Sequence, residues 1–127
     1  MTVEARALTE PWQAAYATGA HSGVSDTFKQ GVGGGAGMRP HELLEAALAS
    51  CMTIAARMEL HDLGADDTGV SVRVEIERAE DLSRFHYALD LPVGLEAHRA
   101  AIMNRLERSP VRATLSKPLE FTAVEPA

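Results

Sequence analysis

The chain has 127 residues, 46% hydrophobic and 24% charged, which suits one compact domain with its own core. This composition is typical of a globular protein and excludes collagen-like, low-complexity and disordered chains. The net charge of −6 argues against nucleic acid or an anionic membrane surface as a partner. No apolar run approaches the roughly 20 residues of a membrane-spanning helix. The N-terminus also lacks the pattern of a secretory signal.

The first third of the sequence predicts a small antiparallel meander. Three short segments with partial alternation are separated by turn residues, and they cover residues 3–8, 13–18 and 23–28. The glycine-rich residues 29–38 follow, without the lysine and hydroxyl pair of a phosphate-binding loop. We expect a mobile connection here, or a hinge that lets the chain cross to a partner.

Residues 40–63 predict a long helix. Pro40 suits a first helical turn, and Gly64 is a typical C-terminal stop. One apolar stripe follows helical spacing and consists of Leu44, Ala47, Leu48, Cys51, Ala55 and Met58. Much of the other side is also non-polar, which indicates a central helix surrounded by protein.

The second half of the chain predicts a mixed set of elements. Residues 69–79 alternate as a half-buried strand, residues 84–91 form its antiparallel partner, and residues 94–108 form an amphipathic helix. Ser109 and Pro110 open a short helix, and residues 118–124 form a last strand. The order is that of a single α+β domain over residues 1–127. The first three strands are poor in large apolar residues, which favours a dimer whose chains complete each other's sheets.

Cys51 is the only cysteine. A single cysteine excludes a disulfide framework and a cysteine-only metal site within one chain, and it fits a reducing compartment such as the cytoplasm. Such a residue is either a small core hydrophobe or a reactive thiol. His61, His86 and His98 have no ligand spacing to one another, so we expect neither a metal nor a cofactor.

Several motifs resemble the OsmC/Ohr family of osmotically inducible and organic hydroperoxide resistance proteins. Residues 40–53 (PHELLEAALASCMT) are similar to its central-helix signature, and residues 69–74 (GVSVRV) to its next strand. Residues 109–115 (SPVRATL) resemble its second-cysteine motif. Upstream, His21 with Asp26 and the run Gly33-Gly34-Gly35 resemble the approach to the helix in one branch. The likeness covers nearly the whole chain in the right order.

The resemblance implies an OsmC-like fold, with antiparallel sheets around a long buried central helix, completed in an intertwined homodimer with sites at the interface. It also implies a thiol peroxidase of the oxidative stress response that reduces organic hydroperoxides. In such members the first cysteine becomes a sulfenic acid, the second condenses with it to a disulfide, and a dithiol reduces that bond. Cys51 matches the first cysteine. Because an ordinary thiol has a pKa of about 8.5, a positive neighbour is needed to form the thiolate at neutral pH.

The sequence departs from the family pattern at two places. Ser109 occupies the position of the second cysteine, so turnover requires an external thiol or dithiol. The family's glutamate ten residues before the cysteine is His41 here, with Glu42 one step later, and its arginine falls at His21. The candidate catalytic residues are therefore Cys51, Glu42, His21 and His41. The alternatives are structural or exposed histidines, a Glu42 that serves the helix N-terminus, and a Ser109 that caps a helix or contacts Cys51.

Three functions remain open at this point. The first is that Cys51 reduces or senses organic hydroperoxides with an external thiol. Alternatively, an apolar pocket at the dimer interface binds a small apolar ligand without catalysis. The third possibility is a structural descendant with neither activity.

Overall fold

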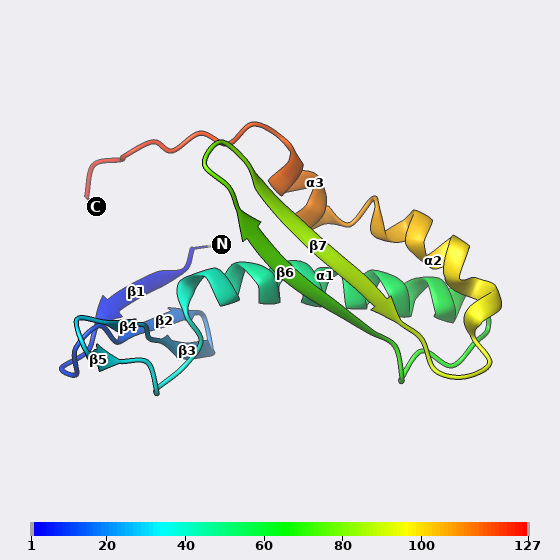
Figure 1. Ribbon diagram of the computed structural model, residues 1–127, viewed down its shortest axis with the longest axis horizontal. Helices are drawn as coiled ribbons and strands as arrows, with labels where there is room; N and C mark the ends of the chain where they lie inside the picture. The colour runs from blue at the N-terminus through cyan, green and yellow to red at the C-terminus, as the bar shows by residue number, and fades with distance from the viewer. Residues whose placement is uncertain (1, 127) are drawn as a thin grey trace. The chain divides into compact units, whose positions relative to one another are not determined.

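The computed structural model describes residues 2–126 and has the predicted α+β composition with antiparallel sheets (Figure 1). In chain order the elements are β1 (Glu4–Ala7), β2 (Ala14–Thr18), β3 (His21–Ser25), β4 (Phe28–Lys29), β5 (Val32–Gly33), α1 (Pro40–Asp62), β6 (Ser71–Arg78), β7 (Ser83–Asp90), the 3-10 helix η1 (Glu96–His98), α2 (Arg99–Leu106) and α3 (Pro110–Ser116). Two compact units meet between Ala46 and Ala47, and each is described by itself. Within residues 2–126, no helix combines the length and apolarity that crossing a bilayer requires.

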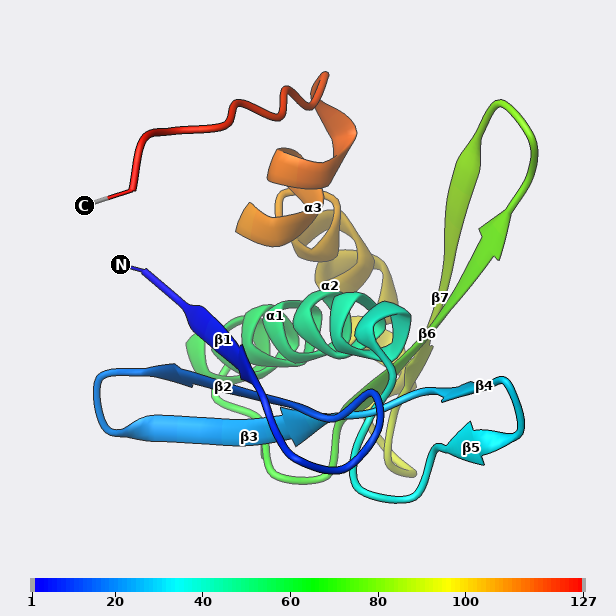
Figure 2. The same ribbon diagram turned by 90° about the vertical axis from the view of Figure 1, so that its left-hand side faces the viewer.

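The predicted meander is confirmed in the first unit. Its strands pair antiparallel in the order β1-β2-β3 (Figure 2). Gly19, with a φ of +56°, lies in the turn that brings Thr18 opposite His21. Tyr16 lies opposite Gly23, and a side chain at Gly23 would collide with its ring. The third strand therefore begins two residues earlier than predicted and uses its glycine to accommodate an aromatic neighbour.

The glycine-rich segment contains more regular structure than the expected mobile connection. Strands β4 and β5 form a hairpin across Gln30 and Gly31, which both have positive φ angles. Beyond the hairpin, the backbone N–H of Ala36 donates to the Asp26 carboxylate at 3.1 Å. The Asp26 backbone N–H donates to the Met38 carbonyl oxygen, also at 3.1 Å. The buried carboxylate of Asp26 thus accepts a backbone hydrogen bond from the glycine-rich segment, whose glycines have no side chains that could do so.

Helix α1 begins and ends as the sequence predicts, to within one residue. At its start the Glu42 carboxylate accepts the Arg39 backbone N–H at 2.8 Å, which is half of a capping box. At its end Gly64 has a φ of +72°. The Gly64 N–H donates to His61 O and the Ala65 N–H to Leu60 O, which is the Schellman pattern.

The second unit is built around the part of α1 that begins at Ala47. Hairpin β6–β7 turns one apolar face to the helix, and its other face carries charged residues, as the alternation predicts. Helix α2 lies alongside (Figure 1). The buried core draws on all three and consists of Leu48, Met52, Ala55, Ala56, Leu60, Val70, Val72, Leu89, Ile102 and Leu106.

The expectation that α1 is surrounded by protein is wrong within the single chain. Leu48 and Ala55 are buried, but Leu44 and Met58 of the predicted stripe are exposed. Hairpin β6–β7 and helix α2 cover one side of the helix. Large apolar residues on its other side are exposed, namely Ile54 and Met58.

The predicted last strand at residues 118–124 is also wrong. The segment has no regular secondary structure, and its large apolar residues are exposed, namely Leu119, Phe121 and Val124. A strand forms only with a partner for its backbone N–H and C=O groups. None of the described strands pairs with this segment.

Candidate functional site

Cys51 lies in the middle of α1 and is half-buried. Its Sγ accepts a hydrogen bond from the Oγ of Ser109 at 3.0 Å, across 58 positions of sequence. Ser109 is 1% exposed, so this hydroxyl is shielded from water. The structure therefore brings together Cys51 and Ser109, the two positions that the sequence resemblance predicts to correspond to a cysteine pair.

Ser109 occupies the N-cap position of α3, as predicted, but its side chain makes no capping hydrogen bond. The backbone holds it in place, since its N–H donates to Leu106 O at 3.1 Å and its carbonyl accepts the Ala113 N–H at 2.9 Å. Leu106 is itself fully buried in the core. The hydroxyl is thus fixed by the junction of α2 and α3 and directed at sulfur rather than at its own helix.

The outer side of Cys51 opens onto an apolar strip of α1. We define the α1 seam as Ala47, Cys51, Ile54 and Met58, which follow one another at spacings of four, three and four residues. Ile54 is 54% exposed and Met58 is 51% exposed. A sulfur in this position borders apolar groups on its exposed side and a hydroxyl donor on its buried side.

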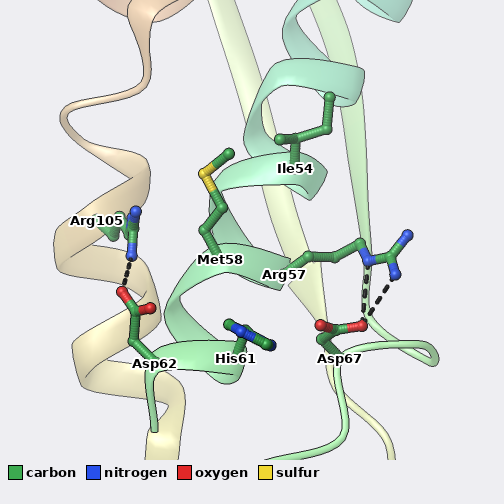
Figure 3. A pocket seen from close by; sticks show the side chains of 7 residues that line it. All are labelled: Ile54, Arg57, Met58, His61, Asp62, Asp67 and Arg105. Atoms are coloured by element: carbon green, nitrogen blue, oxygen red, sulfur yellow. Dashed lines mark hydrogen bonds and ion pairs between the residues drawn. The ribbon is translucent and has the colours of Figure 1, made fainter.

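A groove of about 470 Å³ adjoins the seam (Figure 3). Ile54 and Met58 supply its apolar surface. Two ion pairs flank it, Arg57–Asp67 at 3.0 Å and Arg105–Asp62 at 3.0 Å. Each cation in this rim is matched by a carboxylate, so the groove offers apolar contact without a net charge.

The other candidate residues all belong to the first unit. Glu42 is engaged at the helix N-terminus, where it accepts the Arg39 N–H. It precedes Cys51 by nine positions of α1, which correspond to about 14 Å of rise and about half a turn of a regular helix. His41 is exposed in the first turn, and His21 is exposed at the start of β3. Their catalytic roles remain predictions.

Charged side chains on the exposed face of hairpin β6–β7 form ion pairs that shift pKa values. On the hairpin, the hydrogen bond from Arg73 holds the pKa of Asp90 below its ordinary value. The hydrogen bonds from His86 and Arg84 do the same for the pKa of Glu77. These contacts link the charged side chains on the exposed face of the hairpin.

Sequence analysis gave no physical role to Asp26, which the structure shows to be 2% exposed. Its carboxylate accepts the backbone N–H groups of Thr27, at 2.7 Å, and Ala36. The sequence signal for this role was an aspartate just before a glycine-rich run, because aspartate side chains commonly accept hydrogen bonds from backbone N–H groups in turns.

Comparisons with known proteins give a consistent result. A family model described as "OsmC-like protein" matches residues 33–124. Solved structures that resemble the chain include the following three. A Psychrobacter arcticus protein, assigned to osmotic stress induction and the detoxification response, has a TM-score of 0.71 and 20% identity over 90% of this chain and 87% of its own. No curated protein matches the sequence.

The other two structures are similarly distant in sequence. An OsmC-like protein from Mycoplasma pneumoniae has a TM-score of 0.67 and 16% identity, over 90% of this chain and 85% of its own. An organic hydroperoxide resistance protein OsmC from Legionella pneumophila has a TM-score of 0.62 and 18% identity, over 91% and 88%. At these identities the likeness establishes the fold.

Proposed function

The chain belongs to the OsmC-like protein family, and we propose that it reduces organic hydroperoxides through Cys51 as part of an oxidative stress response. The proposal is supported by the named activity of the Legionella pneumophila structure, which shares the fold. The single observation that carries it is the half-buried Cys51 Sγ, which accepts a hydrogen bond from the buried Ser109 hydroxyl at 3.0 Å.

The reaction follows ordinary thiol chemistry. The Cys51 thiolate attacks the terminal oxygen of a hydroperoxide ROOH, so that the S–O bond forms as the O–O bond breaks. Sulfur is oxidised by two electrons to a sulfenic acid. The peroxide is reduced, and its alkoxide takes a proton to leave as the alcohol ROH.

The surroundings of the sulfur favour an organic peroxide over hydrogen peroxide. On its exposed side Cys51 is bordered by Ala47 and Ile54, which offer apolar contact and few hydrogen bonds. An alkyl or aryl group on the peroxide would lie against this strip, and burying it would contribute about 25 cal/mol per Å² of apolar surface. Hydrogen peroxide has no such group.

Turnover requires an external thiol because the chain has no second cysteine. A first thiol R′SH attacks the sulfenic sulfur, forming a mixed disulfide and releasing water. A second thiol then attacks the mixed disulfide, which restores the Cys51 thiol and releases R′S–SR′. A dithiol accomplishes both steps with one molecule. This requirement also fits a reducing compartment, and we propose the cytoplasm.

The test is intact-protein mass spectrometry after stoichiometric cumene hydroperoxide, with a sulfenic-acid trap present. Trapping at Cys51 much faster than at free cysteine is the expected result. Cys51→Ala is the control and should take up no trap. A Cys51 that reacts no faster than free cysteine would overturn the proposed reaction.

A second candidate function is the binding of a small apolar ligand without catalysis. The groove of about 470 Å³ beside Ile54 and Met58 favours it. An apolar ligand that co-purifies with the protein and is retained by Cys51→Ala would support this second function. The two functions are separated by that variant, since peroxide reduction needs the sulfur and binding does not.

We further propose a homodimer in which a second copy lies over the α1 seam and leaves room beside Cys51 for the organic group of the peroxide. The exposed Ile54 and Met58 support this proposal, because apolar strips of this kind on one helix usually mark a contact surface. We retain His21, His41 and Glu42 as proposed groups that polarise or orient the thiol, with His21 reaching the site from the partner.

A further inference from the structure

We propose that Ser109 is a positioning residue that governs the fate of the Cys51 sulfenic acid, slowing its further oxidation until an external thiol arrives. This inference rests on the proposed peroxide chemistry at Cys51 and concerns the step that follows it. It begins from a chemical problem: a sulfenic acid with no second cysteine can react with another peroxide molecule and become an irreversible sulfinic acid.

The geometry places one polar group against the sulfur on its buried side. The Ser109 Oγ donates to Sγ at 3.0 Å, and at 1% exposure that hydroxyl is shielded from bulk water. Its helix does not use it, since α3 has no side-chain cap from Ser109. The hydroxyl is therefore held by the backbone in the orientation that engages a sulfur lone pair.

The same lone pair is what sulfinic acid formation requires. In that step the sulfenate sulfur attacks a second ROOH, forming a second S–O bond as the O–O bond breaks and ROH leaves. A hydroxyl that donates to sulfur stabilises the lone pair and raises the barrier to this attack. A hydrogen bond to a charged group contributes about 1.5–3 kcal/mol, and the lower value corresponds to roughly a tenfold change in rate.

Attack by an external thiol is affected differently. In that step sulfur is the electrophile, and its lone pair does not form the new bond. Donation from Ser109 withdraws electron density from sulfur and does not oppose the attack. The hydroxyl thus separates two reactions of one intermediate, suppressing the irreversible one while leaving the productive one open.

The test compares wild type, Ser109→Ala and Ser116→Ala at rising cumene hydroperoxide, with sulfenic and sulfinic forms counted by intact mass. Ser116 is the matched control, because its hydroxyl lies in the same helix but donates to the Ala113 carbonyl at 3.1 Å. We expect sulfinic acid to form roughly tenfold faster from Ser109→Ala. The control should match wild type.

Equal sulfinic rates in wild type and Ser109→Ala would overturn the role of Ser109. A wild-type Cys51 that forms no sulfenic acid would instead overturn the proposed function, and iodoacetamide then tests the contact alone. The donor stabilises the sulfur lone pair that attacks iodoacetamide, so its loss should speed alkylation about threefold. Unchanged alkylation would overturn the contact, and melting curves of all three proteins monitor folding.

Discussion

At the scale of single residues, Asp26 shows how one carboxylate orders a flexible sequence. Burial alone would raise its pKa, but hydrogen bonds from the backbone N–H groups of Ala36, Thr27, Gly34 and Gly35 outweigh burial and hold the pKa below its ordinary value of 3.8. The ionised form is therefore part of the folded glycine-rich segment. The glycine content of this segment predicted mobility. Composition does not reveal which side chain accepts hydrogen bonds from the backbone N–H groups, so the order was missed.

This shift predicts an acid sensitivity. The folded state binds fewer protons than the unfolded state, so the contribution of Asp26 is complete above the ordinary pKa and is lost as pH falls through the lower folded value. Asp26→Asn should lower stability in urea unfolding at about pH 6, and the gap to wild type should narrow towards pH 2. Asp81→Asn is the control, since Asp81 is an exposed aspartate in the turn between β6 and β7. A gap that is constant with pH would contradict the prediction.

A second residue-scale prediction uses the contact between Cys51 and Ser109. Ser109→Cys should form a disulfide with Cys51 under cumene hydroperoxide, because their side chains meet at 3.0 Å. The mass falls by two hydrogens, and closing a loop of 58 positions should stabilise the chain by about 4 kcal/mol in the chain-entropy description. Ser116→Cys should form no such bond. Absence of the bond in Ser109→Cys would mean that the two positions do not face each other in solution.

At the scale of elements, the sequence predicted the bounds of an element best where residues typical of its start and its end are present. Helix α1 has Pro40 at its start and Gly64 at its end, and both bounds were confirmed. Alternation predicted β6 and its inner face. The segment 118–124 has a similar alternation but no strand, because pairing depends on a neighbour that sequence does not specify.

The connection before α1 supplies a prediction at this scale. A side chain at Gly37 would collide with the Val24 carbonyl oxygen, whereas one at Gly35 would meet open space. Gly37→Ala should therefore lower stability by about 1–3 kcal/mol, and Gly35→Ala should be neutral or raise it by up to about 1 kcal/mol. Urea unfolding of both variants gives the comparison. Equal effects would show that the close approach of Gly37 to Val24 does not persist in solution.

At the scale of the whole molecule, the order of motifs predicted the OsmC-like family, and the family model and fold comparisons confirm it. The fully enclosed central helix was not found in the single chain, since Ile54 and Met58 on one side of α1 are exposed. The proposed homodimer would account for this exposed side of α1. It remains a prediction.

That prediction is tested by a charge on the α1 seam. Ala47→Glu should raise the dimer dissociation constant by about 100-fold, since burying an unpaired carboxylate costs about 3 kcal/mol or more. Ala100→Glu is the matched control, because Ala100 is an exposed alanine on α2 outside the seam. Sedimentation velocity over a concentration series measures both. Equal dissociation of the two variants would remove the seam from the interface.

The α1 seam also determines how such an assembly responds to temperature. Covering Ile54 and Met58 removes apolar surface from water, which gives association a negative heat-capacity change that calorimetry can measure. Apolar association weakens on cooling. A cold solution would therefore separate the copies and open the sulfur side of α1 to solvent, with no covalent bond changed. In the proposed dimer, the exposure of Cys51 to solvent would thus depend on temperature through the helix that carries it.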